Sequence, residues 1–188
     1  NRHLLAVLFA DEFPGIAGLT GPFVLLVLCS IATTNIISAP SISLEGKNLW
    51  IAQSIPVKAS DVLMSKAYAH MTVCLPSVLF AGVMLNLILN INPLTRVLLF
   101  LTPAALTVFQ AMFGVAVNLR FPKFDWISEM IAVKQGASTL IAMFGSMALV
   151  ALPTILYATV LSSLIRPEIY IALVTVLIAG LAAGLNVF

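Results

Sequence analysis

Long apolar runs separated by shorter polar stretches form the main pattern along this chain. A helix that crosses a hydrocarbon layer of about 30 Å needs about 20 mostly apolar residues, because each residue adds about 1.5 Å. Five runs meet this requirement, and they cover residues 16–37, 67–89, 97–119, 137–165 and 169–188. The pattern therefore predicts an all-α fold: a polytopic transmembrane helical bundle of about five spanning helices.

The amino-acid composition supports the prediction of a membrane protein. The chain is 61% hydrophobic and 9% charged, whereas soluble domains carry about 25% charged residues. A chain of 188 residues cannot hide so much apolar surface in one core, so long runs must face lipid or each other. Its net charge of +2 is small and its basic residues are scattered, so the sequence predicts no nucleic-acid partner.

The connections between the runs fall into two classes. Residues 90–93 and 166–168 form short turns, whereas residues 38–66 and 120–135 are longer and rich in lysine and arginine. Basic residues gather on the cytoplasmic side of membrane proteins. The two longer connections are therefore predicted to be cytoplasmic. Residues 1–14 contain an apolar run too short to span and are interpreted as an external or re-entrant piece.

The first long connection is too polar to span and too apolar to be a free loop. A helix lying on the membrane surface would place one apolar stripe towards lipid or a partner. Pro56 is expected to end this helix, and Asp61 to open the next spanning helix, where a carboxylate suits the helix dipole. An ordinary interfacial loop is the alternative. The stripe consists of Leu44, Ile51 and Ile55, with Trp50 beside them.

The second long connection reads RFPKFDWISEMIAVKQ over residues 120–135. At helical spacing Asp125 and Glu129 lie four residues apart on a more solvated side, which predicts a second amphipathic helix. Trp126 is equally typical of a simple aromatic anchor at the membrane boundary. The apolar face of this predicted helix consists of Phe124, Ile127 and Ile131.

These segments together resemble the permeases of type-two (ABC-2) ABC exporters, in a bacterial subgroup. In that family an acidic residue and glycine, an apolar stretch, a proline and a lysine join the second and third spans, and an FPKFDW-like string occurs in the next cytoplasmic loop. The resemblance follows spans two to six of a six-span unit, so residues 1–188 are expected to be one transmembrane domain excised from a longer permease. The residues that match the first connection are Glu45, Gly46, Leu49, Trp50, Pro56, Val57 and Lys66.

The resemblance implies a site for each long connection. Residues 41–60 would hold the coupling helix, which docks on a cytoplasmic ABC ATPase subunit, with Trp50 as its best single anchor. Residues 120–135 would be the second cytoplasmic loop. The ATPase-coupling residues would be Glu45, Gly46, Lys47, Asn48, Leu49, Trp50, Ile51, Ile55 and Pro56, and the loop residues would be Phe124, Asp125, Trp126 and Glu129.

Candidate chemistry within the chain is sparse. No charge falls at the centre of a span, and His70 is expected near the inner end of the second span. No His, Cys, Asp and Glu cluster suggests a metal, and no glycine-rich loop suggests a bound phosphate. Cys29 and Cys74 lie in apolar runs, so no disulfide is expected.

The functional expectation combines the resemblance with this sparse chemistry. The chain is expected to be the permease subunit of an ATP-driven exporter in a bacterial inner membrane, and not an enzyme. ATP and Mg²⁺ would be bound by a separate ATPase subunit, so the chain itself would hold no cofactor. Its other partners would be membrane lipid and a second permease copy or half. The alternative function is an ATP-independent carrier or channel.

Overall fold

The computed structural model describes residues 20–89 and 91–185, and every regular element in this part of the chain is a helix. Four helical stretches are long and apolar enough to cross a membrane, namely α4, α5, α7 with the preceding α6, and α8. The predicted all-α membrane bundle is therefore confirmed, with four rather than five spanning candidates among the described residues, because the run over 16–37 is described only as a helix of 15 residues. The interpretation of residues 1–14 lies outside the described residues. The elements are α2 (Thr20–Thr34), η1 (Ser43–Asn48), α3 (Leu49–Ser54), α4 (Ala59–Ile88), α5 (Pro93–Arg120), α6 (Glu129–Gln135), α7 (Ala137–Thr159), η2 (Leu161–Ser163) and α8 (Pro167–Leu185).

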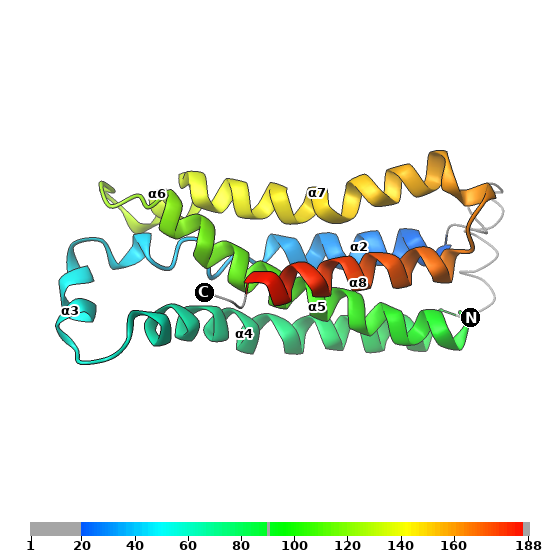
Figure 1. Cartoon of the computed structure of the whole chain (residues 1–188), viewed down its shortest axis with the longest axis horizontal. Coiled ribbons are helices and arrows are strands. Elements are labelled where there is room, and N and C mark those ends of the chain that lie inside the picture. Colours follow the sequence, from blue (N-terminus) through cyan, green and yellow to red (C-terminus); the bar gives the residue numbers. More distant parts are fainter. Residues whose placement is uncertain (1–19, 90, 186–188) are drawn as a thin grey trace.

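Helix α5 is the central element of the bundle. It packs against α2, α4, α7 and α8, which run alongside it (Figure 1). In its most apolar 18-residue window 61% of the residues are buried, against 17% in the corresponding window of α4. In the other spanning helices most residues of the corresponding window are not buried inside the bundle, so most of their surface faces outward.

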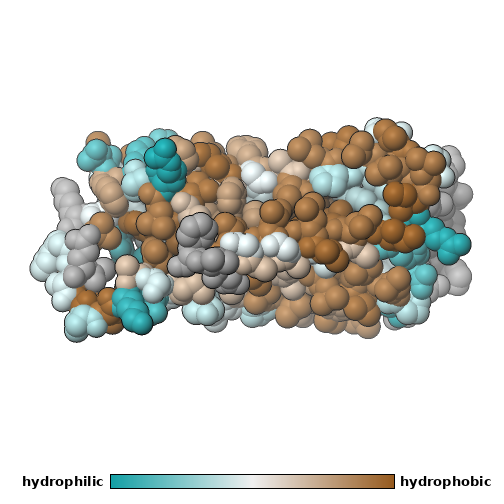
Figure 2. All heavy atoms as spheres, in the orientation of Figure 1, coloured by the Kyte–Doolittle hydropathy of each residue, from teal (hydrophilic) through white to brown (hydrophobic). Residues whose placement is uncertain are grey.

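The core lies between α2, α5, α7 and α8. Figure 2 shows that apolar side chains also cover the visible face of the bundle along most of its length, and exposed large apolar side chains occur on every spanning helix. Such a surface is far larger than the apolar patches of soluble monomers, and it suits lipid as the solvent. The chain is thus a multi-pass membrane protein. The buried core includes Leu25, Leu28, Cys29, Leu99, Leu106, Tyr157, Ile171 and Ile178.

Two stacked tyrosines stabilise the turn between α7 and α8. The rings of Tyr157 and Tyr170 stack with their centroids 4.4 Å apart. Tyr157 donates a hydrogen bond to the carbonyl oxygen of Ile165, and the Tyr170 and Thr154 hydroxyls lie 2.7 Å apart. These contacts satisfy polar groups in the turn and hold α8 against α7.

The second spanning helix begins earlier than the apolar run suggests. We expected it near Ala67, but α4 begins at Ala59 and carries Asp61 in its first turn. The extra turns are helical because they have something to pack against: Leu63 and Ala67 join Ile42 and residues of α5 in a second hydrophobic cluster. This early start places α4 beside the long connections at one end of the bundle.

Candidate interaction site at the loop end

Both long connections lie at the same end of the bundle (Figure 1). We call this region the loop end and define it as residues 35–58 and 120–136. Its first part follows α2 and contains η1 and α3, and its second part joins α5 to α7 and contains α6. The geometry of this region is set by a small number of buried polar side chains.

Asn118, in the last turns of α5, holds the first part of the loop end in place. Its side chain is fully buried and makes four hydrogen bonds. The carbonyl oxygen accepts from the backbone N–H groups of Ile42 and Ser43 at 2.8 and 3.0 Å. The amide nitrogen donates to the hydroxyls of Ser43 and Ser138 at 2.7 and 2.9 Å. One side chain thus ties η1, α5 and α7 together.

Ser43 extends this network to the second connection. Its hydroxyl oxygen accepts from the backbone N–H of Lys123 at 2.9 Å, and its carbonyl oxygen accepts from the indole N–H of Trp126 at 2.8 Å. The two segments that the sequence identified separately therefore form one structural unit. Trp126 is half-buried in this unit and acts as an internal clamp rather than only as a membrane anchor.

The single surface helix expected over Glu45–Ile55 is not present. A 3₁₀ segment at Ser43–Asn48 is followed by the short helix α3, and Gly46 between them has φ +46°. A Cβ atom at Gly46 would lie 2.9 Å from the Trp126 ring. Glycine is required there for both reasons, and it breaks the predicted stripe. Pro56 follows the end of α3, as expected.

The second amphipathic helix is also shorter than predicted. Residues 121–128 are not helical, and only Glu129–Gln135 forms α6. The expected helical face through Phe124 and Ile127 is wrong, because Lys123 and Trp126 instead bond to Ser43. For the same reason Asp125 and Glu129 do not share a helix.

A second set of contacts fixes the chain where it leaves α2. The backbone N–H groups of Ile37 and Ser38 donate to Nδ1 of His70 at 3.3 and 3.4 Å. Gln110 donates from its amide to the carbonyl oxygen of Thr33 at 2.9 Å. His70 is fully buried, so our expectation that it reaches the interface is replaced by a structural role.

An ion pair closes the side of the loop end that faces α4. Lys66 Nζ lies 2.5 Å from Glu45 Oε1 and also donates to the carbonyl oxygen of Ser41 at 3.3 Å. The side chains of Lys66 and Glu45 are only 14% and 28% exposed. Glu45, predicted as a docking residue, is therefore largely used within the chain.

Other predicted docking residues remain accessible. Trp50 is 65% exposed, and Ile51 and Ile55 are also exposed. Asn48 and Pro56 are exposed and Leu49 is half-buried, while the Lys47 side chain lies outside the described residues. In the second connection Phe124, Asp125 and Glu129 are exposed. The predicted site thus has two parts. Glu45, Gly46 and Trp126 make contacts within the chain and form an internal clamp, whereas Trp50, Ile51 and Ile55 form an outer apolar surface.

Sequence reasoning missed the residues that organise this region, above all Asn118 and Ser43. The only local signal for Asn118 is a polar side chain close to the end of an apolar run, just before Arg120. Across the described residues there is no group of three or more His, Cys, Asp or Glu side chains that could hold a metal ion.

A family of proteins described as "Putative ATP-binding cassette" matches residues 22–187. This match covers nearly all of the chain, including every spanning helix and the whole loop end. The chain belongs to this ATP-binding-cassette family. Comparison of the chain with curated proteins and with solved structures found no match.

Membership in this ATP-binding-cassette family corrects two expectations. The match supports an ABC context, but its description points to ATP binding and an ATPase-like role, so our expectation of a type-two permease subunit is wrong. The expectation that the chain has no enzymatic role is overturned by the same description. The sequence strings that resembled permeases were too short to separate members of the wider ABC group.

Gly46→Ala is expected to lower the free energy of unfolding by about 2 kcal/mol, because a positive φ costs a non-glycine residue roughly 1–3 kcal/mol and the new methyl group meets Trp126. Denaturant unfolding in detergent micelles measures this change. Gly184→Ala is the matched control, since a Cβ there meets nothing within 4 Å. Adding Trp126→Ala to Gly46→Ala should cost less than the sum of the two single changes; strict additivity would contradict the clamp geometry.

Proposed function

We propose that this protein has an ATP-dependent role in a membrane, and that the loop end is the surface through which its bundle engages the ATP-binding part of the machinery. The observation that carries the proposal is an exposed apolar patch on a firmly held support. The patch consists of Trp50, Ile51, Ile55 and Val57. The family description supports the involvement of ATP.

Trp50 and Ile51, the outer part of the patch, lie beyond the part of the bundle that lipid would cover. Helix α4 has 30 residues, which correspond to about 45 Å, the thickness of a bilayer with its headgroups. Because Trp50 and Ile51 precede Lys58 and the first turn of α4, they lie outside the hydrocarbon layer. Exposed apolar side chains in that position favour a protein contact, in which a tryptophan is a typical anchor.

The support of the patch is suited to transmitting a contact into the bundle. Segment η1, just before α3, is held by Asn118 from α5 and by Lys66 from α4. A partner that binds α3 would therefore act on two spanning helices through short hydrogen-bonded links. This arrangement favours a working interface over a loop that merely covers the end of the bundle.

The residues proposed for this interface are those that the sequence singled out and the structure leaves accessible. They are centred on Trp50 and Ile51, with Ile55 and Pro56 beside them. Residues Phe124 and Asp125 from the second connection extend the surface. The loop end is then cytoplasmic, as its lysine and arginine content favours.

The proposal extends to the membrane that holds the protein and to a further partner. We place it in a bacterial cell membrane with a second copy of the chain as a further partner. The exposed side chains of Leu173, Val176 and Leu177 on α8 support the second copy, because they offer an apolar face that a second bundle can cover. Membrane fractionation tests the location, and cysteine cross-linking at position 176 tests the pairing of copies.

Trp50→Ala is expected to weaken association between the bundle and the ATP-binding part of the machinery about 30-fold, because loss of an aromatic anchor costs roughly 2 kcal/mol. ATP hydrolysis by the protein, purified with the ATP-binding part that it retains, should fall accordingly. Phe80→Ala is the matched control: Phe80 is 64% exposed, but it lies well along α4 on the bundle. Equal hydrolysis and equal retention of the ATP-binding part in both variants would rule out this interface.

Photoaffinity labelling with an azido-ATP probe complements this test. Labelling that falls in Trp50→Ala but not in Phe80→Ala supports the proposed interface. Equal labelling of the two variants would contradict a contact role for the loop end.

A further inference from the structure

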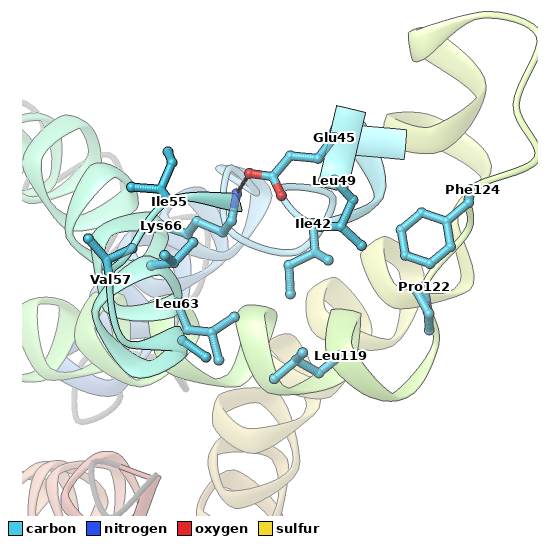
Figure 3. Close-up of a pocket in the computed structure, with 12 residues that line it drawn as sticks. Ile42, Glu45, Leu49, Ile55, Val57, Leu63, Lys66, Leu119, Pro122 and Phe124 are labelled. Carbon is cyan, nitrogen blue, oxygen red and sulfur yellow. Dashed lines mark hydrogen bonds and ion pairs between the residues drawn. The ribbon is translucent and has the colours of Figure 1, made fainter. Parts of the chain in front are cut away.

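A cavity of about 470 Å³ lies at the loop end between the two long connections and the first turns of α4. In Figure 3, Ile55, Val57 and Leu63 lie on one side of it, and Leu119, Pro122 and Phe124 lie on the other. Its size is within the range of small-molecule pockets, which are mostly apolar with a few polar groups. The remaining lining residues are Ile42, Glu45, Leu49, Ala59, Val62 and Lys66.

The cavity lies at the end of the bundle where a helix as long as α4 would meet the lipid headgroups. Its α4 residues belong to the first eight residues of a helix that is long enough to reach through both headgroup regions. Its α5 residue, Leu119, belongs to the last turn, directly before Arg120. Ala59 and Leu119 are exposed, so the apolar lining continues onto the side of the bundle that faces lipid.

Charged side chains beside the lining favour an anionic ligand. Within the wall, Glu45 and Lys66 neutralise each other. Lys58, Arg120 and Lys123 each stand next to a lining residue in the chain, and no carboxylate of the described residues lies within 4 Å of any of them. The carboxylates closest to these three cations in the sequence are Asp61 and Asp125. Three cations against two carboxylates leave one net positive charge in these segments.

We propose that this cavity binds one anionic phospholipid of the surrounding membrane. An acyl chain would lie among Val62, Leu63 and Leu119, and the phosphate would lie near Lys58 and Lys123. Basic pockets between spanning helices on the cytoplasmic side are suited to anionic headgroups. A lipid fits better than a peptide, because the apolar lining opens towards the bilayer. The inference does not depend on the proposed ATP-dependent role.

Native mass spectrometry of the full-length protein in mild detergent, with added phosphatidylglycerol or phosphatidylcholine, tests this site. We expect the wild-type protein to retain one phosphatidylglycerol at least tenfold more strongly than phosphatidylcholine. Ala59→Phe should fill the cavity and reduce retention at least tenfold. Ala69→Phe is the matched control, since Ala69 is exposed on the same helix and does not line the cavity.

Substitution of surface lysines tests the site without introducing a larger side chain that the fold must tolerate. Lys58→Gln combined with Lys123→Gln should reduce the preference for phosphatidylglycerol at least threefold. Lys134→Gln, an exposed lysine of α6 at the same end, should leave the preference unchanged. Equal retention of the two lipids by the wild-type protein, or equal retention by the Ala59 and Ala69 variants, would overturn the assignment. No nucleotide is added, so this outcome is independent of any failure of the proposed function.

Discussion

Asn118→Ala should lower the free energy of unfolding more than any other single polar substitution in the bundle. The change leaves the buried backbone N–H groups of Ile42 and Ser43 without an acceptor. Each unsatisfied group costs about 1–3 kcal/mol, so the expected loss is roughly 2–6 kcal/mol. Denaturant unfolding in detergent micelles measures the loss, and limited proteolysis should show faster cleavage within residues 35–58.

Asn86→Ala is the matched control for this experiment. Asn86 also lies in a spanning helix, but its amide only donates to the carbonyl oxygen of Gly82 in its own helix, and its own carbonyl oxygen has no partner among the described residues. Its replacement leaves no backbone N–H without a partner, so the loss should stay below about 1 kcal/mol. Similar losses at the two positions would show that Asn118 does not organise the loop end.

Gly114→Ala is expected to separate the loop end from α5. A Cβ atom at this position would overlap the Ser38 hydroxyl and lie 3.0 Å from the backbone nitrogen of Ala39. Because one of these contacts is with backbone, the segment must shift as a whole, and overpacking of this kind costs about 1–3 kcal/mol. The shift should also weaken the hydrogen bonds that Ile37 and Ser38 donate to His70.

Gly180→Ala should have the opposite sign. A Cβ there meets nothing within 4 Å, and alanine is favoured over glycine inside a helix by roughly 0.5–1 kcal/mol. Thermal unfolding of both variants in the same detergent compares them directly. A stabilising Gly114→Ala would contradict the close approach of residues 38–39 to α5.

The spans could be predicted from the sequence because lipid imposes a length requirement that local composition reveals. The central place of α5 could not, since all five runs are similarly apolar. A trace of it is visible afterwards: the run over 97–119 carries Thr102, Thr107, Gln110 and Asn118, and all four are buried. Polar side chains in a spanning helix need partners from other helices, so their number favours a central position.

Individual residues of the loop end were predicted from the sequence, but the contacts that join its two connections were not. Trp50 and Ile51 were identified from local apolar spacing, and they are exposed as a contact surface requires. The bonds from Asn118 and Trp126 to Ser43 join residues about 75 or more positions apart, and no local pattern encodes such a contact. The helix breaks at Gly46 and before Glu129 follow from these distant bonds, so they were missed as well.

The same distant bonds bear on how the protein is made. The ribosome delivers α2 and residues 35–43 well before α5, yet Thr33, Ile42 and Ser43 find their hydrogen-bond partners on Gln110 and Asn118 of that later helix. Until α5 is in place, these backbone groups lack the side-chain partners that they have in the native fold. The arrival of α5 is therefore expected to be the step that fixes residues 35–43 in their native conformation.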